Sequence, residues 1–111
     1  MRRPKPRRSR RYLIQVELLE LNNKPGAGNY LRDLSAMGAR LETATSFVAR
    51  TPVEFTFILP GEEEAMRLGG QVVWARPVIG KLSRYLVGVK LFQTLWELDL
   101  WSRRWEGLQP K

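Results

Sequence analysis

The sequence contains neither cysteine nor histidine. Disulfides and thiolate nucleophiles need cysteine, zinc sites need cysteine or histidine in most cases, and imidazole is the commonest general base. The only run of carboxylates is Glu62–Glu64, which lies among turn-forming residues. The sequence therefore predicts a protein that is not an enzyme and that holds no metal and no cofactor.

Long apolar runs are also missing, because charged residues interrupt the hydrophobic segments every few positions. The basic N-terminus is not followed by an apolar stretch of signal-peptide length. The apolar fraction of 43% is nevertheless sufficient for the core of one domain. We therefore expect a cytoplasmic protein that does not insert into a membrane.

Acidic residues are absent from the N-terminal segment, where most of the net charge of +8 resides. Seven cations lie there, at positions 2, 3, 5, 7, 8, 10 and 11, whereas the remainder of the chain is nearly neutral. This composition predicts a flexible arginine-rich arm over residues 1–11, followed by a single domain over residues 12–108. The charge of this arm implies an anionic partner.

Short alternating segments separated by turn residues dominate the rest of the chain. In the clearest of them Val53, Phe55, Phe57 and Leu59 alternate, with the polar residues Glu54 and Thr56 between the first three, so the odd positions are expected to face the core. Five further segments resemble strands: Tyr12–Leu21, Tyr30–Asp33, Ala39–Thr43, Gln71–Arg76 and Tyr85–Leu91. The last two are expected to pair as a hairpin, and the whole pattern predicts an antiparallel sandwich or barrel.

Near the C-terminus the spacing of the apolar residues changes from that of a strand to that of a helix. Thr94 and Glu97 have the spacing of a capping box, and Leu95, Leu98, Trp101 and Trp105 recur at helical spacing. We therefore predict an α-helix over about residues 94–106 that packs against the sheet.

Two short motifs could bind a ligand. Arg7 and Arg11 have the spacing Arg-x-x-x-Arg just before the first strand, although Arg3 and Arg7 have the same spacing. A guanidinium donates two parallel hydrogen bonds to a phosphate or to the O6/N7 edge of guanine. The alternative interpretation is a solvated tail.

The second motif is Asp33-Leu34-Ser35-Ala36-Met37-Gly38. As an ordinary turn, it would use Asp33 and Ser35 to bind backbone N–H groups and Gly38 to adopt a positive φ. As a binding turn, Asp33 would accept hydrogen bonds from a guanine edge, Ser35 would donate to a phosphate or a base, and Gly38 would admit the ligand close to the backbone.

Together the two motifs resemble the PilZ domain, a bacterial family of cyclic di-GMP receptors. The resemblance continues through Gly38–Leu41, Phe57–Pro60, Val72–Trp74 and Val87–Phe92. It implies a mainly β fold, a six-stranded antiparallel split β-barrel with a C-terminal α-helix, and a ligand held outside the barrel by the arm. The ligand-binding residues would be Arg7, Arg8, Arg11, Asp33, Ser35 and Gly38, with Arg10, Arg40 and Trp74 as further candidates.

The expected function is that of a stand-alone receptor whose arm becomes ordered on cyclic di-GMP and relays the signal to an unidentified effector protein. The ligand stoichiometry, one cyclic di-GMP or an intercalated pair, stays open at this point. Two alternatives remain: a small barrel that binds single-stranded nucleic acid, and a PilZ adaptor that needs no ligand. Nucleic acid is the less favoured partner because the basic residues are confined to the arm instead of lining a groove.

Overall fold

A computed structural model describes residues 11–98, 100 and 101 of the chain. Arg7, Arg8 and Arg10 of the predicted site lie outside these residues, as does most of the predicted arm. The described residues form one antiparallel sheet with the strands β1 (Tyr12–Glu17), β2 (Glu20–Leu21), β3 (Lys24–Pro25), β4 (Tyr30–Leu34), β5 (Gly38–Thr43), β6 (Pro52–Ile58), β7 (Ala65–Pro77) and β8 (Tyr85–Leu91). The prediction of a mainly β antiparallel fold is therefore confirmed.

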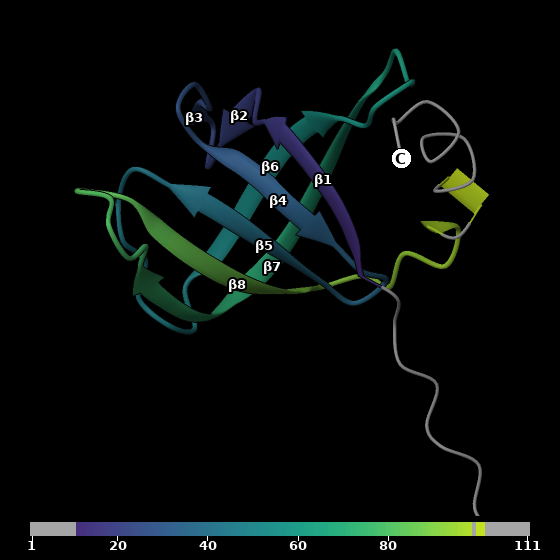
Figure 1. Cartoon of the computed structure of the whole chain (residues 1–111). Coiled ribbons are helices and arrows are strands. Elements are labelled where there is room, and N and C mark those ends of the chain that lie inside the picture. Colours follow the sequence, from purple (N-terminus) through teal and green to yellow (C-terminus); the bar gives the residue numbers. More distant parts are fainter. Residues whose placement is uncertain (1–10, 99, 102–111) are drawn as a thin grey trace, which may run out of the picture.

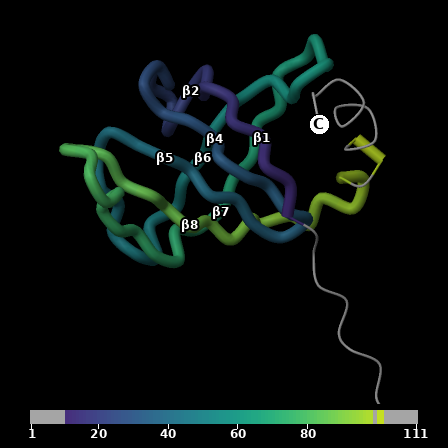
Figure 2. The backbone as a smooth tube through the Cα atoms, in the orientation of Figure 1, coloured from purple at the N-terminus to yellow at the C-terminus, as the bar shows by residue number. Residues whose placement is uncertain are grey.

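The strand order in the sheet is β1-β4-β5-β8-β7-β6-β2-β3. Figure 1 shows the sheet curled into a half-barrel, with β6 and β7 passing behind β4 and β5. The chain runs from β1 directly into β2, as Figure 2 shows. β2 then pairs with β6, at the other side of the sheet from β1. One short segment of chain thus joins both margins of the curled sheet around a common core.

The number of strands differs from the prediction, since the described residues contain eight strands where the resemblance implied six. The predicted strand Tyr12–Leu21 is divided into β1 and β2, and its register against β4 shifts between Leu13 and Val16. Gln15, inside this irregularity, has a φ of 57°. The additional strand β3 has only two residues and pairs with β2.

The core follows the alternation that the sequence predicts for β6. Val53, Phe55 and Phe57 are buried, while Glu54 faces solvent. The rings of Phe55 and Phe57 lie 5.8 Å apart between centroids. Burying a phenylalanine side chain contributes about 1.5–3 kcal/mol, so this strand is a main source of core stability.

The predicted hairpin of Gln71–Arg76 with Tyr85–Leu91 is confirmed, but β7 begins six residues earlier, at Ala65. Gly69 and Gly70 lie inside this extended strand. A Cβ at Gly70 would overlap the Lys90 carbonyl oxygen. Glycine is therefore required at this position by a close approach of two strands.

Most of the predicted helix over about residues 94–106 lies outside the described residues, and the helix stays a prediction. In the described part, the Trp101 N–H donates to the Glu97 carbonyl oxygen at 3.0 Å. Leu95 and Leu98 are buried, and Trp101 packs against the core, as the predicted stripe requires. Across the described range, no helix is both long enough and apolar enough to cross a membrane.

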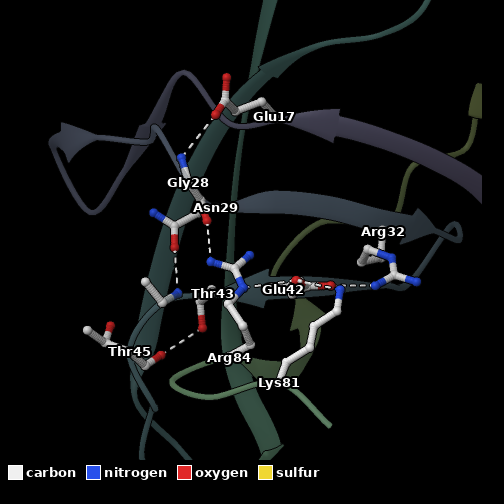
Figure 3. A network of polar contacts seen from close by, with 10 residues as sticks. Glu17, Gly28, Asn29, Arg32, Glu42, Thr43, Thr45, Lys81 and Arg84 are labelled. Carbon is white, nitrogen blue, oxygen red and sulfur yellow. Dashed lines mark hydrogen bonds and ion pairs between the residues drawn. The ribbon is translucent and has the colours of Figure 1, made fainter. Parts of the chain in front are cut away.

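A polar network holds the ends of β4, β5 and β8 together. Figure 3 shows three cations converging on Glu42 of β5: Arg32 at 2.5 Å, Arg84 at 2.9 Å and Lys81 at 3.8 Å. Arg84 also donates to the Gly28 carbonyl oxygen at 2.6 Å, which connects the loop before β4 to the same network. Burial raises the pKa of Glu42, but hydrogen bonds from Arg84 and Arg32 outweigh it and leave the pKa below its ordinary value of 4.5.

The substitution Glu42→Gln is expected to lower the free energy of unfolding by about 1–3 kcal/mol at pH 7, because the cations lose their buried anion. A carboxylate with a lowered pKa stabilises the fold above its ordinary pKa, and this contribution disappears as the pH falls through the lowered value. The stability difference from the unmodified protein should therefore shrink below pH 4.5. Urea unfolding at pH 7 and at a pH below 4.5 measures this stability difference. An equal difference at the two pH values would contradict the role of the ionised carboxylate.

Candidate functional site

Five residues form one row across the outer face of the sheet. Leu13 of β1 faces Asp33 of β4, Asp33 faces Arg40 of β5, Arg40 faces Gly88 of β8, and Gly88 faces Trp74 of β7. Neighbours in such a row lie about 4.5–5.5 Å apart at Cβ. The register therefore brings together residues from five strands that are far apart in the sequence.

Two β-bulges increase the number of side chains on this face. The register of β4 against β5 shifts between Leu31 and Asp33, which inserts Arg32 beside Asp33. That of β7 against β8 shifts between Val72 and Trp74. A bulge places two residues opposite one and re-aims their side chains. In β7 the result is that Val73 and Trp74 are exposed by 55% and 36%, although they are adjacent in the strand.

The carboxylate of Asp33 lies beneath two arginines. One oxygen accepts a hydrogen bond from Arg11, and the other accepts from Arg40 at 2.6 Å. The Asp33 side chain is only 2% exposed, while the two arginine side chains are 43% and 35% exposed. Asp33 therefore holds both guanidinium groups at the surface, and it fixes the residue at which the predicted arm joins the sheet.

The predicted turn after Asp33 is present, and its hydrogen bonds are local. The Ser35 hydroxyl oxygen accepts from the Gly38 N–H at 3.1 Å, and the Ser35 N–H donates to the Gly38 carbonyl oxygen at 2.8 Å. The expected positive φ at Gly38 is wrong, because Gly38 is not among the glycines with that conformation. A Cβ at Gly38 would instead lie 2.9 Å from the Val89 carbonyl oxygen, so close packing against β8 requires glycine there.

A cavity of about 550 Å³ opens above this part of the sheet. The predicted site residues around it are Arg11, Ser35, Gly38, Arg40 and Trp74. Asp33 lies outside its lining and borders a neighbouring cavity instead. The predicted site residues that the structure describes thus lie close together. Asp33 does not line the cavity but binds Arg11 and Arg40, which do.

Several lining residues were not predicted as site residues from the sequence, chiefly Met37, Val73, Gly88 and Lys90. Lys90 alternates with the buried residues Val89 and Leu91 and faces Gly38 of β5. The alternation in Tyr85–Leu91 indicates that Lys90 points outward, but only the strand register places it at this cavity.

The electrostatics and shape of the cavity favour an anion that carries a flat ring. In the described part of the chain, the charged residues that line it are Arg11, Arg40 and Lys90, all of them cations. Trp74 extends over Gly88, where a Cβ would overlap the indole ring, and the Arg76 guanidinium lies 4.9 Å from the Trp74 ring centroid. Guanidinium groups bind phosphates, and an indole can stack on a purine.

The substitution Gly88→Ala is expected to push the Trp74 indole from its place, because the added Cβ overlaps the ring. The Trp74 Nε1–H resonance, assigned by its loss in Trp74→Phe, should shift strongly, and acrylamide should quench Trp74 fluorescence more. Gly69→Ala is the matched control, since its Cβ would lie at an ordinary 3.5 Å from the Phe92 ring. An unchanged Trp74 resonance in Gly88→Ala would show that the indole does not cover Gly88.

Comparison with known proteins agrees with the resemblance seen in the sequence. A family model described as the PilZ domain matches residues 2–97, which include the N-terminal segment, the Asp33–Gly38 turn and Trp74. No curated protein and no solved structure matched the chain. The PilZ domain family comprises cyclic di-GMP-binding receptors, which are ligand-binding and adaptor domains and generally not catalytic. Since the family model spans most of its length, the chain belongs to the PilZ domain family.

Proposed function

We propose that the chain is a cytoplasmic receptor for cyclic di-GMP that holds the dinucleotide in the cavity above Gly38 and Gly88. The observation that carries the proposal is that three cations, Arg11, Arg40 and Lys90, line one cavity together with the Trp74 indole. Cyclic di-GMP has two phosphates and two guanine bases, so it offers partners for both kinds of group. The cavity volume also lies within the range of sites for small organic ligands.

In this proposal the described residues have separate roles. Arg11, Arg40 and Lys90 bind phosphate oxygens or the acceptor edge of guanine, and the Trp74 indole stacks on one base. Gly38 lets the ligand approach the backbone, and Gly88 leaves room for the Trp74 indole. Arg7, Arg8 and Arg10 would complete the site from the arm, although they lie outside the described residues.

Asp33 needs a more detailed account. Both of its carboxylate oxygens accept hydrogen bonds from arginines. For Asp33 to accept a guanine N–H as well, the ligand must share or replace one of these contacts. We therefore propose that Asp33 first positions Arg11 and Arg40 and contacts guanine only once phosphate has drawn an arginine away.

Ordering the arm limits the affinity. Fixing a backbone residue costs about 1–2 kcal/mol, and a hydrogen bond to a charged group contributes about 1.5–3 kcal/mol. Several arginine contacts are therefore needed before the arm becomes ordered. An arm that is ordered only with the ligand changes the surface, and we propose that an effector protein recognises this change.

The substitution Arg11→Ala is expected to weaken cyclic di-GMP binding by at least about tenfold, the effect of one lost charge-assisted hydrogen bond. Isothermal titration measures the affinity, with Lys24→Ala as the control because Lys24 is exposed and outside the cavity lining. Higher salt should weaken binding to the unmodified protein. Unchanged affinity in Arg11→Ala would contradict the proposal, and tighter binding of a single-stranded oligonucleotide than of cyclic di-GMP would favour the nucleic-acid alternative.

The substitution Trp74→Ala is expected to weaken binding by about 1–3 kcal/mol through the loss of base stacking. Trp74→Phe should retain part of this energy, because a phenyl ring still offers a flat apolar face. Titration with GMP and with cyclic di-GMP separates stacking from phosphate binding. If Trp74→Ala binds as tightly as the unmodified protein, the indole is part of the surface packing and not of the site.

A further inference from the structure

A second cavity, of about 560 Å³, lies on the other side of Arg40 on the same outer face. It extends from Leu13 of β1 to the residues around Ile79, in the connection between β7 and β8. Arg40 borders both cavities, whereas Trp74 and Lys90 line only the first. The two cavities are therefore neighbours with different chemical character.

Three aliphatic residues in the lining of the second cavity are exposed or half-buried. Ile79 is 100% exposed, Leu13 is 68% exposed and Leu86 is half-buried. Hydrogen bonds within the connection, including one from the Val78 N–H to the Arg84 carbonyl oxygen at 2.8 Å, hold it in shape. A fixed apolar surface next to a cavity is typical of an interaction site.

The same cavity is rich in cations. Arg32, Arg40 and Arg76 line it, and Asp33 is the only carboxylate among its described lining residues. Asp33 already binds two arginines, and Glu42 close by binds Arg32, Arg84 and Lys81. Both carboxylates are thus outnumbered by their cations, and the cavity has an excess of positive charge.

We propose that this groove, lined by Leu13, Arg32, Arg40, Arg76, Ile79 and Leu86, binds an acidic segment of a protein partner that carries an aliphatic side chain between its carboxylates. The carboxylates pair with the arginines, and the aliphatic side chain packs against the aliphatic residues between them, such as Leu86 beside Arg76. Nucleic acid fits less well, because none of the described residues that line the groove is aromatic and could stack on a base. A lipid surface would reach Ile79 but not the side of the cavity formed by the strands.

This second site does not rest on cyclic di-GMP binding in the first cavity. The two are nevertheless adjacent through Arg40, and Asp33 borders the second cavity while holding Arg11 and Arg40 at the first. An occupant of either cavity therefore changes the charge that the other presents.

The test measures binding of a fluorescein-labelled peptide of three Glu-Glu-Leu repeats to the full chain by fluorescence anisotropy, without cyclic di-GMP. Peptides with Lys-Lys-Leu and Glu-Glu-Ser repeats are the controls for charge and for the aliphatic anchor. Arg76→Glu is expected to weaken binding by at least about tenfold, and Ile79→Ser by about fivefold. Arg50→Glu makes the same charge change at an exposed position outside the groove and should leave binding unchanged.

Support for the proposal requires weaker binding of both control peptides and peptide-induced shifts of the Leu13, Ile79 and Leu86 methyl resonances. Equal binding by Arg76→Glu and Ile79→Ser would overturn it. Binding to vesicles of phosphatidylserine and phosphatidylcholine, with no peptide binding, would overturn it in favour of a membrane surface. Because no dinucleotide is present, the outcome is independent of the titrations with cyclic di-GMP.

Discussion

The buried carboxylate of Asp33 joins parts of the molecule that would otherwise be independent. Its two arginine partners come from different places: Arg11 precedes β1, and Arg40 lies in β5. Leaving such a carboxylate without a partner would cost several kcal/mol, so the folded state strongly favours having at least one arginine in place. The same contact fixes the start of the first strand and holds two guanidinium groups at the surface.

The position of Arg40 between two cavities gives the outer face of the sheet two adjacent sites. On one side lie Trp74 and Lys90, which suit a ligand with phosphates and bases. On the other side lie Ile79 and Leu86 beside Arg76, which suit a protein segment with aliphatic and acidic side chains. In the proposed receptor, the ligand and the effector would bind to adjacent surfaces that share Arg40.

Local patterns in the sequence predict much of this molecule because they reflect short-range physics. The spacing of the apolar residues in Val53–Leu59 predicts which side chains face the core, since successive side chains of a strand point to opposite faces. The bounds of Tyr85–Leu91 and its pairing with β7 follow from the same period and from the turn residues between them. The chemistry of arginine and the local turn Asp33–Gly38 also indicate an anion-binding site without any knowledge of the fold.

What the sequence by itself determined was a mainly β domain, a basic N-terminal segment and a motif that places the chain among PilZ domains. Only the tertiary structure decided how the strands align. The bulges beside Asp33 and Trp74, the alignment of Gly88 under the indole and the arrival of Lys90 at the cavity all depend on register. Register arises from packing between strands distant in the chain, and a shift by one residue would turn every side chain to the other face.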